Sequence, residues 1–97
     1  MSGINYVERN GKHFITYNEN GAEAGFIEVT SNNKVINALH TEVKPEFSGK
    51  GIGKLLFNGF VDYAKSNGLK VKADCTFIHS QLKRHHDELK EIIADEV

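Results

Sequence analysis

The chain has 97 residues, with 39% hydrophobic and 26% charged residues and a formal net charge of −1 at pH 7. This length predicts a single domain over residues 1–97, and the lack of a basic excess argues against nucleic acid as a partner. The sequence offers no apolar run of membrane-spanning length, no signal peptide and a single cysteine, Cys75, so we expect a reducing, cytoplasmic location without membrane association.

The first half of the chain predicts an antiparallel meander. Three runs are rich in strand formers, and they span residues 12–17, 24–30 and 34–43. The turns between them fall at residues 18–21 and 31–33, where Asn and Gly tolerate positive φ. The last run ends before Pro45, and its period of two places four residues on one face: Ile36, Ala38, His40 and Glu42.

The second half predicts helices around one further strand. Apolar residues recur at three- and four-residue steps over residues 51–66, which indicates a helix, and Asn67-Gly68 ends it. Residues 69–75 alternate as a half-buried strand does. Two more helical segments are predicted, over residues 77–85 with Thr76 as a cap and over residues 88–95.

These elements predict an α/β (α+β) fold. A strand–helix–strand connection between residues 34 and 75 is expected to be right-handed and to leave its two strands parallel. The expected architecture is therefore a mixed β-sheet with an N-terminal antiparallel meander and flanking helices.

A glycine-dense turn, Ser48-Gly49-Lys50-Gly51-Ile52-Gly53-Lys54, precedes the first predicted helix. Because glycine lacks a Cβ and adopts positive φ readily, such a turn lets the main chain approach an anion closely. The first helical turn adds unpaired N–H groups and the positive end of the dipole, and Lys50 and Lys54 add full charges. The spacing matches neither a P-loop nor the dinucleotide fingerprint. We interpret the turn as a phosphate or pyrophosphate seat, with an ordinary strand-to-helix connection as the alternative.

The same turn resembles the acyl-CoA-binding signature of the GNAT acetyltransferases, which is Gln or Arg, two residues, Gly, one residue, and Gly or Ala. Ser48 stands where that family has Gln or Arg. A closer resemblance is to very small single-domain GNAT-like enzymes, called YidJ-like or minimal N-acetyltransferases. It rests on three blocks: His40-Thr41-Glu42-Val43, Cys75-Thr76-Phe77 and Arg84-His85. Gln81 and His86 stand where that pattern commonly carries tyrosine and proline.

This resemblance implies an N-acetyltransferase that uses acetyl-CoA and an amine acceptor, without a metal. Acetyl-CoA would lie in a cleft between the third strand and the strand that ends at Cys75, with the pantetheine arm on the main chain of Glu42 and Val43. The pyrophosphate would lie on the glycine turn, and further residues would line the ligand or its nucleotide end. The implied cofactor-binding set is Glu42, Val43, Ser48, Gly49, Lys50, Gly51, Ile52, Gly53, Lys54, Phe77, Lys83, Arg84 and His85.

Three residues are candidates for the chemistry of transfer. His40 is the candidate base for the incoming amine, because imidazole is the usual proton acceptor in such reactions, and Glu42 on the same strand face is its orienting group or the base itself. Cys75 precedes a predicted helix, whose dipole favours a thiolate. It is therefore a candidate nucleophile, a pocket-lining thiol or a small core residue.

Two functions remain open at this point. The first is N-acetyl transfer, which we expect to proceed by direct attack of the amine on the thioester rather than through an acetyl-cysteine. The second is a CoA-binding or protein-interaction module without transferase activity. Neither the identity of the acceptor nor the oligomeric state follows from the sequence, and no HExxH or CxxC pattern predicts a metal site.

Overall fold

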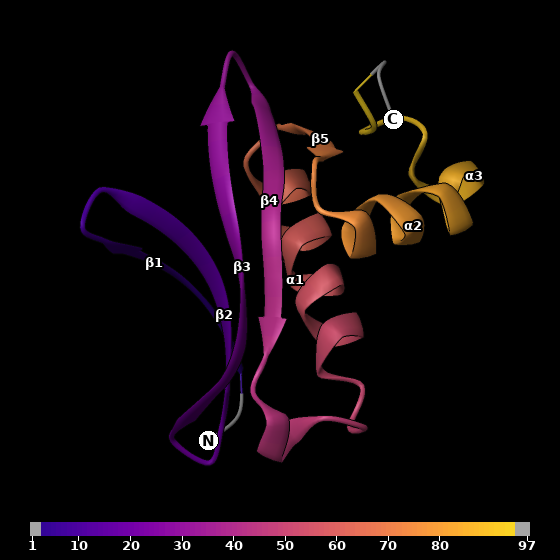
Figure 1. Ribbon diagram of the computed structural model, residues 1–97. Coiled ribbons are helices and arrows are strands. Elements are labelled where there is room, and N and C mark those ends of the chain that lie inside the picture. Colours follow the sequence, from indigo (N-terminus) through magenta and orange to yellow (C-terminus); the bar gives the residue numbers. More distant parts are fainter. Residues whose placement is uncertain (1–2, 95–97) are drawn as a thin grey trace.

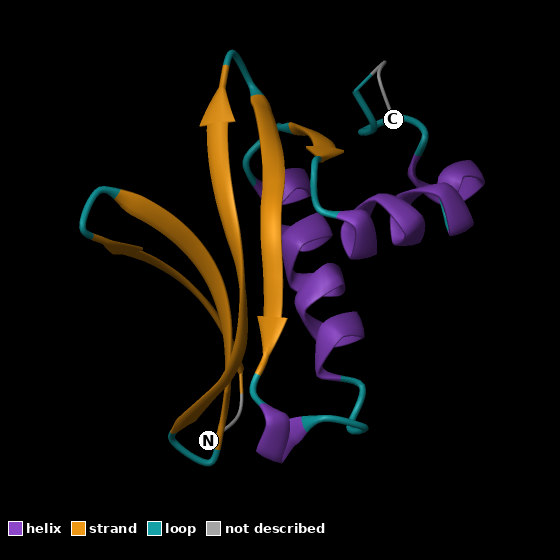
Figure 2. Ribbon diagram, in the orientation of Figure 1, coloured by secondary structure: helices purple, strands orange, loops and turns teal. Residues whose placement is uncertain are grey.

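The computed structural model describes residues 3–94 and contains one five-stranded sheet whose helices gather on one side (Figure 1 and Figure 2). The strands lie in chain order: β1 Gly3–Arg9, β2 Lys12–Glu19, β3 Ala22–Asn32, β4 Val35–Val43 and β5 Lys70–Ala73. The first four pair antiparallel, and β5 pairs parallel with β4. The helices are the 3₁₀ helix η1 Pro45–Phe47, α1 Ile52–Ser66, α2 Thr76–Arg84 and α3 His86–Leu89. The predicted α/β (α+β) fold with its antiparallel meander is confirmed.

Two-residue turns join the strands of the meander. All six residues at the three turns have positive φ, and they are Asn10-Gly11, Asn20-Gly21 and Asn33-Lys34. Turns of this kind match the right-handed twist of the flanking strands, which is why Asn and Gly are favoured there. No strand is predicted before residue 12, yet β1 pairs along its whole length with β2. Since β1 is an edge strand with mostly exposed side chains, it lacks the apolar alternation of a buried strand.

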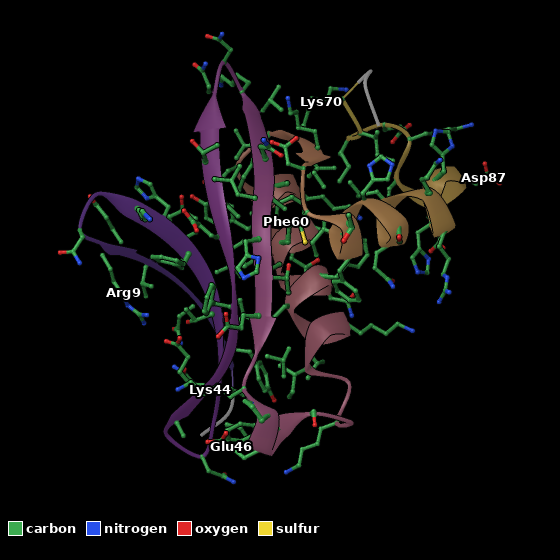
Figure 3. All side chains as sticks on the ribbon, in the orientation of Figure 1. Arg9, Lys44, Glu46, Phe60, Lys70 and Asp87 are labelled. Atoms are coloured by element: carbon green, nitrogen blue, oxygen red, sulfur yellow. The ribbon has the colours of Figure 1, made fainter. Side chains whose placement is uncertain are left out.

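The hydrophobic core lies between the sheet and α1. Helix positions at three- and four-residue steps are buried there, among them Ile52, Leu56, Phe60 and Ala64. They meet buried strand residues from β2 to β5, such as Ile15, Ile27, Ile36 and Val71. Phe60, labelled in Figure 3, is the largest fully buried side chain and anchors α1 on the sheet. None of the described helices is long and apolar enough to cross a membrane.

A β-bulge interrupts β4 at Leu39. Ala38 pairs with Val29 of β3, and the next pair is His40 with Glu28, so Leu39 has no counterpart in β3. An extra residue in one strand reverses the alternation of side chains beyond it. The two halves of β4 therefore present opposite sets of side chains to the core.

The bulge overturns the expectation of one shared face along β4. That expectation covered Ile36, Ala38, His40 and Glu42. The first two are fully buried, whereas the last two are exposed. Beyond the bulge Thr41 pairs with the buried Ile27 and so faces α1. His40 and Glu42 consequently lie on the sheet face that points away from α1.

The chain after Ala73 also differs from the expected elements. The strand expected over residues 69–75 is shorter, and Cys75 is the N-cap of α2. Thr76 is the first helical residue rather than a cap, and no side-chain cap bond forms at this helix start within the described structure.

The helix expected over residues 88–95 is wrong. α3 ends at Leu89, and Ile93 then forms a parallel bridge with Val71. The N–H of Val71 donates to the carbonyl oxygen of Ile92 at 2.7 Å, and the N–H of Ala94 donates to that of Val71 at 2.8 Å. The chain after α3 thus turns at residues 90–92 and then pairs with the free edge of β5 through a single bridge. Asp95 lies outside the described residues.

Candidate active site

β4 extends beyond β5 at its C-terminal end. The parallel pairing of the two strands ends at Ala38 and Ala73, whereas β4 continues to Val43. The chain leaves β5 at this point, and the N–H groups of Asp74 and Cys75 donate to the carbonyl oxygen of Ala38 at 2.9 and 3.0 Å. These bonds hold the start of α2 beside β4. The last residues of β4 therefore form an open strand edge at the position of the expected cleft.

Cys75 lies at the N-terminus of α2 and faces the α1 side of the sheet. Its Sγ is 3.3 Å from the Thr41 Oγ1, and the thiol is half-buried. The sequence analysis did not identify Thr41 as a catalytic or cofactor-binding candidate. The bulge at Leu39 turns it toward the thiol, and nothing in a single sequence marks the position of that bulge.

His40 and Glu42 lie together on the other face of β4. The His40 Nε2 is 3.6 Å from the Glu42 Oε1, and the two side chains are 59% and 60% exposed. The His40 ring centroid is 6.2 Å from that of Phe26. The structure therefore brings His40 to Glu42, as expected, but it separates both from Cys75 by the thickness of the strand.

The glycine turn has the geometry that an anion seat requires. Gly49 and Gly51 have φ of 79° and 74°, and Gly51 is the N-cap of α1. A Cβ at either position would meet no described atom within 4 Å, so glycine serves the left-handed conformation there and the adjacent space is open. Within the described chain, α1 has neither a side-chain cap nor an acidic residue in its first turn. Its first N–H groups and dipole thus remain available to a phosphate.

Two polar residues of the turn already have partners. The Ser48 hydroxyl donates to the carbonyl oxygen of Pro45 at 2.9 Å, which closes η1. The Lys50 Nζ is 3.5 Å from the Glu19 Oε2 and 5.5 Å from the centroid of the Phe47 ring. Lys50 is therefore drawn toward the β2–β3 turn, and its charge is shared with a carboxylate.

Phe77 explains the third glycine of the turn. A Cβ at Gly53 would lie 3.0 Å from the Phe77 Cζ, so the missing side chain lets this ring rest on the first turn of α1. Phe77 remains 37% exposed. Gly53 thus brings the starts of α1 and α2 together.

The residues expected at the nucleotide end lie at the C-terminal end of α2. His85 and the exposed Lys54 line one cavity of about 350 Å³ between α1 and the α2–α3 segment. The His85 ring stacks on Phe57 with centroids 6.0 Å apart, and its Nδ1 is 3.0 Å from the Glu88 Oε1. Lys83 and Arg84 are exposed on the last turn of α2. Within residues 3–94 no group of three or more His, Cys, Asp or Glu side chains is arranged to hold a metal.

Comparison with known proteins adds a family to this geometry. The model of the GCN5-related N-acetyl-transferase family matches residues 12–92. A candidate GCN5-like N-acetyltransferase from Staphylococcus aureus, solved by NMR, is 32% identical, with a TM-score of 0.65 over 97% of this chain and 91% of that chain. No curated protein matches significantly.

More distant structures share the fold. The ribosomal-protein-S18-alanine N-acetyltransferase from Escherichia coli has a TM-score of 0.66 at 14% identity, over 75% of this chain and 66% of that one. Nourseothricin acetyltransferase has a TM-score of 0.55 at 21% identity, over 80% and 48% of the two chains.

The fold and the family match define an acyl-transferring enzyme. The chain belongs to the GCN5-related N-acetyltransferase family. The GNAT resemblance of the sequence is thereby confirmed, and the protein is an N-acetyltransferase. The narrower likeness to the minimal enzymes stays a prediction.

Proposed function

We propose that the protein transfers the acetyl group of acetyl-CoA to an amine, and that the amine attacks the thioester directly. The observation that carries this proposal is the separation of the two reactive side chains. His40 lies on one face of β4, while the Cys75 thiol lies on the other beside Thr41. A base that serves an incoming amine needs no contact with the thiol, whereas a His-activated cysteine would need one.

The donor site in this proposal combines the open edge of β4 with the N-terminus of α1. The main chain of Glu42 and Val43 binds the pantetheine arm, and residues 49–54 bind the pyrophosphate. The uncapped start of α1 and its two left-handed glycines support this fit. The proposal also includes cofactor contacts at Phe77, Lys83, Arg84 and His85; it is supported by the Phe77 ring resting at Gly53 and by the cavity that His85 shares with Lys54. A cytoplasmic location and a single domain over residues 1–97 belong to the same proposal.

Transfer then depends on three groups of this chain: the His40 imidazole, the Glu42 carboxylate and a main-chain N–H at the β4 edge. Acetyl-CoA, when bound, supplies the acetyl group as a thioester. The His40 imidazole accepts the proton that the attacking amine loses, and the Glu42 carboxylate, 3.6 Å from the His40 Nε2, stabilises the imidazolium that forms. The new bond joins the amine nitrogen to the acetyl carbon while the carbon–sulfur bond breaks, and CoA leaves as a thiolate that takes up the proton held on His40. A main-chain N–H at the β4 edge stabilises the developing oxyanion. Cys75 and Thr41 shape the wall of the cleft.

The proposal is tested by incubating the purified chain with acetyl-CoA and a panel of amines and identifying products by mass spectrometry. The substitution His40→Gln should lower the rate by about 10²–10⁴-fold, which is the usual contribution of a general base. The matched control is His86→Gln, since His86 is exposed on α3 and takes no part in the proposed chemistry. The control should turn over as the unchanged protein does.

The same assay separates direct transfer from its alternatives. Cys75→Ala should retain most of the activity, and acetyl-CoA alone should leave no acetyl group on the protein. An acetyl adduct on Cys75 that passes its group to an amine would overturn direct attack. Tight CoA binding without turnover of any amine would favour the binding module instead.

A further inference from the structure

A second cavity lies between the β1–β2 hairpin and α1, apart from the proposed transfer site. Its volume is about 420 Å³. None of the described residues proposed for donor binding or transfer lines it. The volume falls within the range of small-molecule sites in proteins, which is about 300–1,000 Å³.

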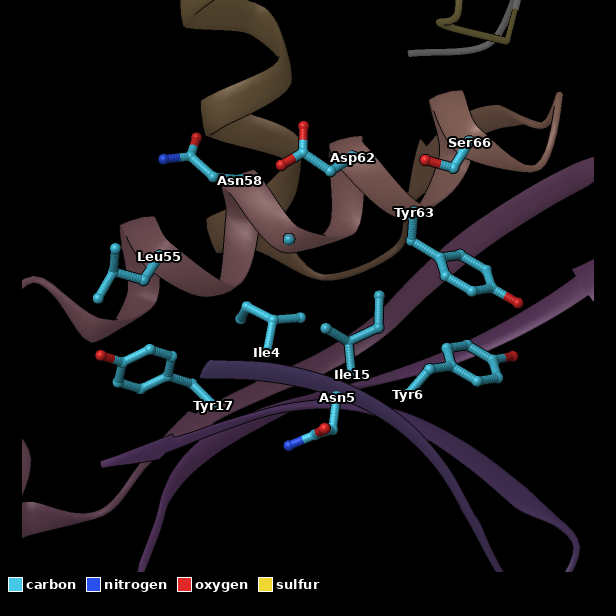
Figure 4. Close-up of a pocket in the computed structure, with 11 residues that line it drawn as sticks. Ile4, Asn5, Tyr6, Ile15, Tyr17, Leu55, Asn58, Asp62, Tyr63 and Ser66 are labelled. Carbon is cyan, nitrogen blue, oxygen red and sulfur yellow. The ribbon is translucent and has the colours of Figure 1, made fainter. Parts of the chain in front are cut away.

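Aromatic and aliphatic side chains form the walls of this cavity. Figure 4 shows Ile4 in the middle, with Tyr17 toward one end and Tyr6 and Tyr63 toward the other. The Tyr6 and Tyr63 rings stack with centroids 4.3 Å apart and an interplanar angle of 1°. A Cβ at Gly59 would lie 2.9 Å from Ile4, so β1 rests directly on α1 and forms a firm floor.

Most of the large hydrophobic side chains that are exposed in the described structure lie at this cavity. Four large hydrophobic side chains are exposed in the described part of the chain, and three of them line it: Ile4 at 40%, Tyr6 at 37% and Leu55 at 39%. Contiguous exposed apolar groups in a concave site are typical of a binding surface.

One carboxylate stands at the cavity mouth, where it also borders the neighbouring cavity that Lys54 and Lys65 line. Asp62 is the only charged residue among the described ones that line the cavity. In Figure 4, Asn58 and Asp62 lie on the outer side of α1 and point away from Ile4 and the tyrosines, so the carboxylate stands at the rim rather than on the floor. Burial, with Tyr63 as a further cause, raises the pKa of Tyr6 to about 12, so its phenol is uncharged at neutral pH. The walls suit an apolar body and the rim suits a cation.

We propose that this cavity binds an amphipathic organic cation, whose aromatic or branched apolar body lies among Ile4, Leu55 and the tyrosines and whose protonated amine lies at Asp62. Tyrosine rings contribute dispersion and, where a face is free, attraction for the cation. This is a second ligand site of the protein. It does not depend on the proposed transfer reaction, because the two share no residue.

The proposal is tested by NMR titration of the ¹⁵N-labelled chain, without acetyl-CoA. Three probes share one aromatic body and differ in charge: phenethylamine, phenethyl alcohol and phenylpropionate. Phenethylamine should cause saturable shifts in residues 4–6, 15–17 and 55–66, and it should bind about threefold more tightly than the alcohol, as one exposed carboxylate allows. Phenylpropionate should bind most weakly. Asp62→Asn should remove the preference for the amine over the alcohol.

Two further variants complete the test. Asp87→Asn is the charge-matched control, because Asp87 is exposed on α3 and does not line the cavity. It should keep the preference for the amine. Leu55→Gln, at an exposed wall position, should weaken the amine and the alcohol alike. The proposal is overturned if no probe gives saturable shifts in these residues, if the shifts centre on His40 instead, or if Asp62→Asn keeps the amine preference.

Discussion

Gly25 of β3 lies directly against the main chain of β4. A Cβ at this residue would lie 2.6 Å from the carbonyl oxygen of Glu42 and 3.2 Å from the Val43 Cα. Both are backbone atoms, so neither can yield without moving the strand end that carries the proposed pantetheine contacts. The residue thus links the packing of the sheet to the proposed site.

Gly25→Ala should therefore lower the free energy of unfolding by about 1–3 kcal/mol, the usual cost of overpacking. Urea denaturation measures it. Gly3→Ala is the matched control, because Gly3 begins the edge strand β1 with an ordinary φ and its Cβ would meet no described atom within 4 Å. The control should change stability little. Equal stability of the Gly25 variant and the unchanged chain would contradict the crowding.

Tyr6 supplies a prediction about pH. Its pKa is raised from 10 to about 12; burial is the largest cause, and the neighbouring Tyr63 is the next. Between these values the unfolded chain has lost the phenol proton while the folded chain keeps it, so the free energy of unfolding should fall as pH rises from about 10 to 12. The phenolate absorbance should show a component with a midpoint near pH 12. That component should be missing from Tyr6→Phe, and its persistence there would assign it elsewhere.

At the scale of elements, the start of α1 decides whether the glycine turn is an anion seat. Gly51→Val should abolish CoA binding, measured by calorimetry, because valine resists the left-handed conformation and its side chain enters the open space beside the N–H groups. Lys54→Ala should weaken binding only modestly, since the main-chain donors remain.

Gly68→Val controls for backbone strain in this experiment. Gly68 has φ of 66° and follows the C-terminal end of α1, far along the helix from the glycine turn. The Gly68→Val variant should have a lower free energy of unfolding than the unchanged chain and should bind CoA with the same affinity. Unchanged affinity in a folded Gly51 variant would remove the anion seat from the proposed function.

At the scale of the whole molecule, one core supports both the sheet and the site. Leu56 is fully buried and Leu55, its neighbour in α1, is 39% exposed. Leu56→Ala should cost about 2–5 kcal/mol, a large part of the 5–15 kcal/mol typical of a domain. Leu55→Ala should cost less than about 1 kcal/mol. Thermal unfolding compares the two, and similar losses would contradict the burial of only one of them.

Local periodicity by itself determined much of this fold. Apolar residues spaced three and four apart marked α1, alternation marked most of β2 to β5, and Asn and Gly marked the second and third turns, because these signals depend on neighbours along the chain. The glycine turn was visible for the same reason. The expected site residues lie within or next to these elements in the sequence. Their approximate places in the fold were therefore predictable, although their contacts were not.

Only the tertiary structure decided which side chains meet. β1 is an edge strand whose exposed residues carry no apolar pattern, and Ile93 leaves the predicted helix to bridge Val71 because β5 offers a free edge. The bulge at Leu39 depends on pairing with β3, yet it reverses every side chain beyond it. That single extra residue turned Thr41 to Cys75 and His40 away from it. Contacts between strands, unlike periods along one strand, arise only when the partner strand is in place.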